Sequence, residues 1–299
     1  MPGSEQQRRS RIVVAGAMVQ GTAHLANATA CQDAFRSFRV DARTVVLAVA
    51  DGAGSRSRGA LGAHLAVDLA CDLLRSGIPA AEADGSSWTG WVSERARAVV
   101  DAWNEAVDAL GAPLLTDCQE GPEAARSPVA HRSARDQCAS TVAAALLRPP
   151  WVAFLSLGDS FGVVLTRDQL DPRAVERCHL VLPPQASPDR STVFLSSPTA
   201  RARVRSFALR DDELSGVVLA TDGCLPLALD HPSVRGLPPG AGPLPAPGFY
   251  HSLSTMLRAN GGHGEPLRAL LSGPGAARSG DDLTVLGAVL TAEPAEPLR

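Results

Sequence analysis

The chain has 299 residues, of which 45% are hydrophobic and 20% are charged, and its net charge is −3. These values predict a globular protein with one large core. The mixed charge excludes a nucleic-acid binder that relies on a basic stripe, and the chain contains no run of about eighteen apolar residues of the kind that spans a membrane.

The cysteines and the two ends of the chain favour a reduced, cytoplasmic protein. Six cysteines are spread widely with no C-x-x-C pair, so neither a zinc site nor a disulfide framework is expected. Residues 1–11 are polar and basic, and no apolar signal-type region follows them, so we expect a poorly ordered N-terminus. The folded domain is expected to cover residues 12–292, with a tail at 293–299.

The first part of the chain predicts three strands and two helices. Ile12–Val19, Phe35–Val40 and the apolar run that ends at Asp51 have strand patterns, and we interpret them as an antiparallel meander. Apolar residues then recur at helical spacing over Leu61–Leu74, and a second helix is expected over Ser87–Leu110.

The rest of the chain predicts a long surface loop over residues 111–137, an irregular insertion over His231–Gly248, and two late helices, Tyr250–Ala259 and Pro266–Leu271. Strands and helices come in runs and do not alternate, which favours an α+β fold of antiparallel sheets with helices on their outer faces. The strand-like segments are Cys138–Leu147, Trp151–Leu157, Phe161–Thr166, Cys178–Leu182, Val193–Ser196, Val204–Leu209, Val217–Ala220 and Leu283–Leu290.

Asp51 is the residue around which a functional site is expected. The apolar run before it is of strand length, and Gly52 and Gly54 follow it, which indicates a buried strand that delivers a carboxylate to a tight turn. A buried carboxylate is costly unless it is paired or binds a metal ion, and the next basic residues are Arg56 and Arg58. A metal site is therefore the favoured interpretation, although Asp-Gly turns also occur in ordinary hairpins.

The same pattern of an acid beside a strand recurs along the chain. Asp159 and Asp222 each follow an apolar strand, Asp281 precedes the last strand, and Gln32-Asp33 adds a further polar pair. Carboxylates that converge in space repel one another unless divalent cations lie among them. A ligand set of oxygen atoms suits the hard cations Mg²⁺ and Mn²⁺.

These segments together resemble the bacterial branch of the type 2C, metal-dependent Ser/Thr protein phosphatases. The motifs are, in order, Q-D-A, V-A-D-G-A-G, S-T-V, G-D-S, A-T-D-G and D-D-L-T-V, and the resemblance covers roughly residues 12–291. It implies a four-layer α-β-β-α sandwich of two antiparallel sheets flanked by helices, with a binuclear metal site at one end.

The resemblance implies two or three Mg²⁺ or Mn²⁺ ions. Asp51 would bridge the two main ions, Asp222 and Asp281 would complete the site of one of them, and Asp159 would hold a third ion together with Asp222. Gln32 stands where many members have a glutamate ligand, and a neutral amide binds these ions more weakly. The implied ligands are Gln32, Asp33, Asp51, the carbonyl of Gly52, Asp159, Asp222 and Asp281.

Two positions depart from the family pattern. Many members have a phosphate-binding arginine where this chain has Ala28, and the eukaryotic members have a leaving-group histidine where it has Ala53. His24, Arg56 and Arg58 are the candidates to bind phosphate here, and His24 or a metal-bound water would protonate the leaving oxygen.

The implied activity is hydrolysis of phosphoserine and phosphothreonine in proteins by a water that the metal ions activate through Asp51, Asp222 and Asp281. The expected partner is a phosphoprotein, either a Ser/Thr kinase or its targets. Three alternatives remain at this point: acids that only cap turns, a catalytically weak phosphatase-like regulator that binds a phosphoprotein, and a calcium-binding β domain, for which the local D-x-D-x-D-G spacing is absent.

Overall fold

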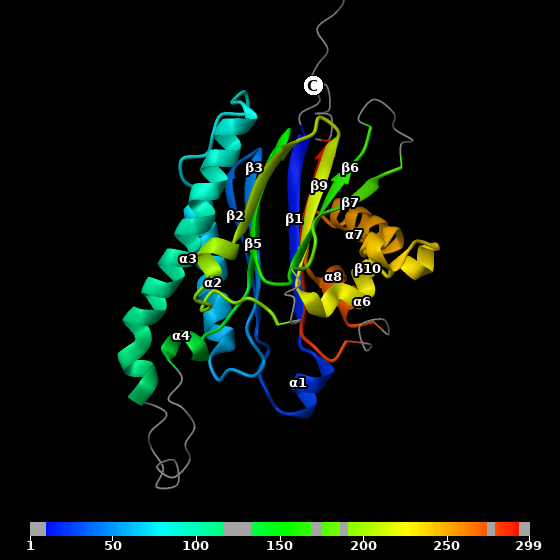
Figure 1. Ribbon diagram of the computed structural model, residues 1–299. Helices are drawn as coiled ribbons and strands as arrows, with labels where there is room; N and C mark the ends of the chain where they lie inside the picture. Colours follow the sequence, from blue (N-terminus) through cyan, green and yellow to red (C-terminus); the bar gives the residue numbers. More distant parts are fainter. Residues whose placement is uncertain (1–9, 117–132, 169–174, 186–190, 274–278, 293–299) are drawn as a thin grey trace, which may run out of the picture.

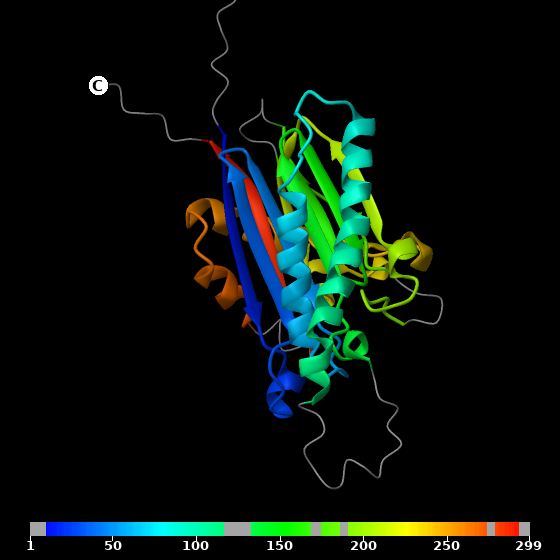
Figure 2. The ribbon, with the colours of Figure 1, turned by 90° about the vertical axis from the view of Figure 1, so that its left-hand side faces the viewer.

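The computed structural model describes residues 10–116, 133–168, 175–185, 191–273 and 279–292. Two five-stranded antiparallel sheets stack face to face, and helices cover the outer face of each sheet (Figure 1, Figure 2). The α+β class and the four-layer α-β-β-α sandwich expected from the sequence are confirmed. Among the described helices, none is both long enough and apolar enough to cross a membrane.

The first sheet has the strand order β1-β12-β9-β6-β7, and the second has the order β2-β3-β4-β5-β8. The strands of the first sheet are β1 (Ser10–Val19), β12 (Leu283–Ala292), β9 (Leu214–Ala220), β6 (Phe161–Thr166) and β7 (Arg177–Leu182). Those of the second are β2 (Asp33–Asp41), β3 (Thr44–Asp51), β4 (Val142–Arg148), β5 (Trp151–Leu157) and β8 (Arg205–Arg210). A short antiparallel ribbon is formed by β10 (Leu229–Asp230) and β11 (Leu244–Pro245).

The long helices α2 (Gly59–Leu74) and α3 (Gly85–Thr116) cover the second sheet, and α7 (Pro247–Ala259) and α8 (Glu265–Leu271) cover the first (Figure 1). The short helices are α1 (Thr22–Ala26), α4 (Ala134–Gln137), α5 (Ala200–Arg203) and α6 (Leu225–Ala228). In Figure 1, α1 lies at the lower end of the sandwich, opposite the end at which β1 begins.

The sequence of β3 does not alternate between apolar and polar residues, and the packing of the strand explains this. Val45, Leu47 and Val49 pack between the two sheets, whereas Val46 and the alanines at 48 and 50 pack beneath α2 and α3. Both faces of the strand are therefore buried, which accounts for the unbroken apolar run at residues 45–50. The expected buried strand before Asp51 is confirmed.

The expected meander at the N-terminus is wrong. The strands β2 and β3 form a hairpin, but β1 pairs along its whole length with β12 in the other sheet. The polar segment between β1 and β2 thus crosses from one sheet to the other at the end where Asp51 lies. Hydrophobic pattern identifies a strand but does not choose its partner, because many apolar strands are equally suitable on that criterion.

Other boundaries also differ from the expectations. Residues 193–196 form no strand, although Leu195 is fully buried. The second helix continues to Thr116, and Ala134–Gln137 forms a short helix, so the expected loop is shorter at both ends; residues 117–132 lie outside the described residues. The first strand begins at Ser10, and residues 1–9 and 293–299 are not described.

A buried ion pair joins α7 to the first sheet. The guanidinium of Arg258 binds the carboxylate of Glu176 and also donates from Nε to the carbonyl of Leu290, 3.3 Å away. Glu176, whose side chain is 6% exposed, also accepts a hydrogen bond from Ser215 Oγ at 2.8 Å. Burial raises the pKa of Glu176, but the hydrogen bonds from Arg258 and two serines outweigh it and hold the pKa below its ordinary value.

Replacing this carboxylate tests the anchoring of α7. We expect Glu176→Gln to reduce the free energy of unfolding by about 1–3 kcal/mol at neutral pH, because Arg258 loses its charged acceptor. The folded-state pKa lies below the unfolded one, so the stabilisation is complete above the ordinary value of 4.5 and is lost as the pH falls through the folded-state pKa. Urea unfolding of both proteins between neutral pH and pH about 3 measures this. A difference that does not shrink in acid would contradict the assignment.

Candidate metal centre

Acids from both sheets converge at one end of the sandwich. Asp33 begins β2 and lies directly opposite Asp51, the last residue of β3. Asp222 follows β9 on a 3₁₀ turn, and Asp159 lies between β5 and β6. Oxygens from Asp51, Asp159 and Asp222 lie within 4.8 Å of one another, although the three residues are far apart in sequence. Asp281, which precedes β12, is close enough to act electrostatically on Asp51 and Asp222.

The electrostatics of this cluster are unfavourable without a cation. Burial, followed by the charges of neighbouring acids, raises the pKa of Asp51 well above its ordinary value. The same two causes raise the pKa of Asp222 to about 7, and burial raises the pKa of Asp33 to about 8 with smaller contributions from nearby acids. Burial and mutual repulsion therefore both disfavour the ionised form of these carboxylates. A bound divalent cation would favour the ionised form instead.

Hydroxyl groups that sequence reasoning missed hold the acids in place. Thr221 Oγ1 donates to Asp33 Oδ2 at 2.8 Å, and Thr192 Oγ1 donates to Asp159 Oδ2 at 2.7 Å. Thr221 immediately precedes Asp222 in the A-T-D-G motif, so the motif could have identified it as a residue of the site. Thr192 lies 33 residues from Asp159 in an irregular segment, and no sequence pattern links the two.

The turn after Asp51 depends on the absence of a side chain at Gly52. A Cβ there would lie 2.3 Å from the carbonyl carbon of Gly59, at the start of α2. The N–H of Gly52 donates to the carbonyl of Gln32 at 3.1 Å. Gly52 therefore lets the Asp51 turn pack directly against α2 and β2. Coordination by its own carbonyl stays a prediction.

The donor set fits a hard divalent cation. Asp159 Oδ1 and Gln32 Oε1 are buried, and neither has a hydrogen-bond partner among the described residues. Buried polar atoms are normally satisfied, so an unpaired carboxylate oxygen and an unpaired amide oxygen beside further carboxylates indicate a missing positive partner. Oxygen ligands of this kind suit Mg²⁺ and Mn²⁺.

Asp282 has a different role from its neighbour Asp281. Its side chain is 1% exposed, and its two oxygens accept hydrogen bonds from the N–H groups of Gly21 and Gln32, each at 2.7 Å. His24 Nδ1 lies 2.9 Å from Asp282 Oδ2. Burial raises the pKa of Asp282, but these hydrogen bonds outweigh burial and keep it below its ordinary value. Asp282 thus has a structural role: it ties the backbone before α1 and the backbone before β2 to the start of the last strand.

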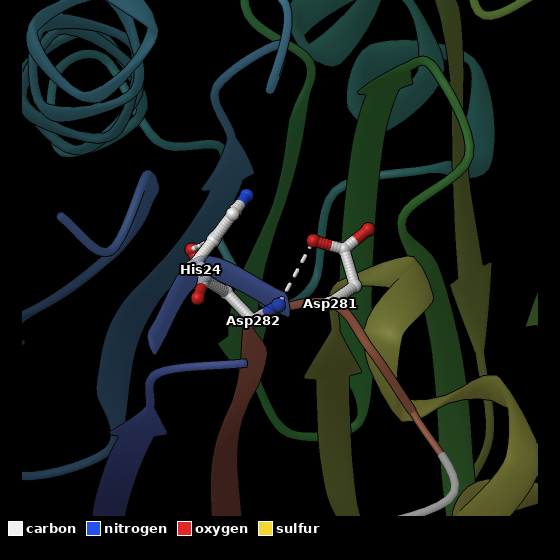
Figure 3. A group of neighbouring side chains, drawn as sticks. All are labelled: His24, Asp281 and Asp282. Atoms are coloured by element: carbon white, nitrogen blue, oxygen red, sulfur yellow. Dashed lines mark hydrogen bonds and ion pairs between the residues drawn. The ribbon is translucent and has the colours of Figure 1, made fainter. Parts of the chain in front are cut away.

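Figure 3 shows His24, Asp281 and Asp282 together. The backbone N–H of Asp282 donates to Asp281 Oδ1 at 2.9 Å, and the two acidic side chains point in different directions. The outer nitrogen of the His24 ring points away from Asp282, toward the side on which the carboxylate of Asp281 lies.

A cavity of about 250 Å³ opens beside the acids. Arg56 and Arg58 do not form its wall; Arg56 is half-buried with an unpaired Nε, and the N–H of Arg58 binds the carbonyl of Gln137. Their binding of phosphate stays a prediction. The residues that line the cavity are Ala23, His24, Asp51, Gly54, Gly280 and Asp281.

The architecture is that of bacterial serine/threonine phosphatases. The serine/threonine phosphatase Stp1 from Staphylococcus aureus is similar with a TM-score of 0.53 and 12% identity, over 97% of this chain and 100% of that one. PppA, a key regulatory component of T6SS in Pseudomonas aeruginosa, is similar with a TM-score of 0.50 and 16% identity, over 95% of this chain and 100% of that one. At these identities the likeness shows the fold alone.

The family is shown by the sequence itself. The profile of protein phosphatase 2C matches residues 20–260, and the chain belongs to that family. No curated protein matches the chain in sequence. Members of the family depend on metal ions, and the acidic cluster described above is present at the expected end of the sandwich.

The raised pKa values predict how the metal-free protein responds to pH. The folded-state pKa of Asp222 is about 7 and that of Asp33 is about 8, against an ordinary value of 3.8. The unfolded chain therefore releases these protons first, so the contribution of these two groups to stability in EDTA is complete below 3.8 and is lost as the pH rises through about 7–8. We expect Asp222→Asn to reduce this loss and Mn²⁺ to reverse it in the wild type. Urea unfolding across this range measures both effects.

The matched control is Asp72→Asn, which removes an exposed carboxylate from α2, outside the cluster. It should leave the pH dependence as in the wild type. A metal-free protein whose stability rises steadily from pH about 4 to pH about 8 would contradict the unfavourable charge of the cluster.

Proposed function

We propose that this protein hydrolyses phosphoserine and phosphothreonine in other proteins, using bound Mg²⁺ or Mn²⁺. The observation that carries the proposal is the convergence of Asp51, Asp159 and Asp222 at the end of the sandwich, with Asp281 beside them. The raised pKa values of Asp51 and Asp222 support it, because such values cluster at functional sites.

The proposed ligands divide between the two sheets. Asp33 and Asp51 come from the second sheet, and Asp222 and Asp281 from the first. When bound, the ions lower the pKa of a water molecule and neutralise charge on the phosphoryl oxygens. The complete proposed set for two or three ions is Gln32, Asp33, Asp51, the carbonyl of Gly52, Asp159, Asp222 and Asp281.

The chain's own groups would bind and orient the substrate in the cavity. His24 lines the cavity together with Asp51 and Asp281 and is placed to contact the phosphoryl group or the leaving oxygen. Arg56 lies in the turn that follows Asp51 and has an unpaired Nε, so it is the second candidate donor to phosphate. The proposed catalytic groups are therefore the acids that hold the ions, together with His24.

The proposed partner is a phosphoprotein, either a Ser/Thr kinase or its targets, in bacterial cytoplasmic signalling. The phosphatase relatives of the same fold support this setting. The regulator is the second candidate, and a specific observation favours it: Ala28, at the position of the family's phosphate-binding arginine, is exposed and has a positive φ of 52°. The side chain of Ala28 carries no charge, so it cannot bind phosphate as the arginine of other family members does.

Turnover of a phosphoserine peptide separates the two candidates. The protein is first stripped with EDTA and then assayed with and without Mn²⁺. We expect hydrolysis only with Mn²⁺, and a loss of at least about 10²-fold in kcat/KM for Asp51→Asn and Asp222→Asn, because each removes a proposed ligand. The control Asp72→Asn should retain full activity. Metal-independent or absent turnover in the wild type would instead support the regulator.

A further inference from the structure

The carboxylate of Asp282 is fixed where three segments meet. Asp282 immediately precedes β12, and its two oxygens accept hydrogen bonds from the N–H of Gly21, before α1, and from the N–H of Gln32, before β2. A Cβ at Gly21 would lie 2.3 Å from the carbonyl carbon of Asp281, so the backbones themselves are in contact. Two backbone hydrogen bonds and near-complete burial leave this side chain a single orientation.

The helix that carries His24 has little else to hold it. The five residues of α1 include none that is buried, and Leu25 is 61% exposed. The N–H of Ala23 binds the carbonyl of Gly280 at 3.0 Å, which fixes the start of the helix but not the imidazole ring. His24 Nδ1 lies 2.9 Å from Asp282 Oδ2, within ion-pair distance but outside hydrogen-bond geometry, and this contact turns the Nδ1 edge of the ring toward Asp282.

With Nδ1 facing Asp282, the other nitrogen of the His24 ring, Nε2, lies at the cavity. A Cβ at Gly54 would lie 3.6 Å from His24 Nε2, and Gly54, His24, Asp51 and Asp281 all line the cavity. Figure 3 shows the outer nitrogen of the ring on the side away from Asp282. A phosphate ester bound beside the acids would thus meet Nε2.

We propose that Asp282 is a positioning residue, which holds His24 so that Nε2–H donates its proton to the serine or threonine oxygen that leaves phosphorus. The inference rests on the proposed phosphatase function and adds a dependence on the leaving group. A carboxylate that accepts Nδ1–H both orients an imidazole and stabilises its cation, as in catalytic triads.

The step balances in atoms and electrons. The oxygen of water bonds to phosphorus while the bond from phosphorus to the serine oxygen breaks, and the electron pair of that bond stays on the serine oxygen. This oxygen takes the proton from His24 Nε2, which leaves a serine hydroxyl and inorganic phosphate. The proton released by the attacking water passes to solvent, from which His24 is protonated again.

The nature of the leaving group provides the test. A serine alkoxide is a poor leaving group that needs a proton, whereas p-nitrophenolate leaves without one. We expect His24→Gln and Asp282→Asn each to lower kcat for a phosphoserine peptide about 10²-fold, and to lower kcat for p-nitrophenyl phosphate much less. The double variant should be no worse than either single variant, because the two residues act as one unit. Matched controls are His64→Gln and Asp72→Asn on α2, both exposed.

Equal losses on both substrates, or losses that add in the double variant, would overturn the proposal. A wild type that hydrolyses neither substrate with Mn²⁺ would instead reject the underlying phosphatase function. Because Asp282→Asn could fail to fold, a long-range proton–nitrogen NMR spectrum of the wild-type imidazoles provides a second measurement. The signals that disappear in His24→Gln should report a protonated Nδ1, and an unprotonated Nδ1 would also overturn the proposal.

Discussion

The repulsion among carboxylates at one end of the sandwich is the constraint on which the rest of the structure depends. Asp33 and Asp51 lie opposite each other in one sheet, and Asp222 joins them from the other. The apolar layer between the sheets, which includes Leu47, Leu219 and Leu286, keeps the two sets of strand ends together. Folding energy from this core therefore maintains a charge arrangement that is unfavourable by itself and becomes favourable when cations bind.

The glycines beside the acids have a physical reason in this arrangement. A Cβ at Gly52 would lie 2.3 Å from the carbonyl of Gly59, and one at Gly223 would lie 1.9 Å from the carbonyl oxygen of Asp282. Each Asp-Gly pair thus joins a charged side chain to a backbone that must pack against another segment. In each Asp-Gly motif the glycine allows the strand end to pack closely against another segment, and the aspartate supplies the proposed ligand.

The sequence was sufficient for the fold class and for most of the strands, and it singled out acids that the structure brings together, because burial and turn chemistry leave local patterns. It was not sufficient where the outcome depends on pairing across the fold. No local pattern links the residues that form three such contacts: the pairing of β1 with β12, the hydrogen bond from Thr192 to Asp159, and the hydrogen bond from Gly21 to Asp282. The segment 193–196 has a strand-like composition but forms no strand; Val193 and Leu195 are buried in it all the same, because burial selects apolar residues whatever the backbone conformation.

The position of bound manganese tests the central claim most directly. Crystals grown with Mn²⁺ and measured at a wavelength at which manganese scatters anomalously would show each ion without reference to activity. The account predicts anomalous peaks among the carboxylates of Asp51, Asp159 and Asp222 and beside Asp281. Fully occupied peaks elsewhere on the molecule, with none at this end of the sandwich, would contradict it.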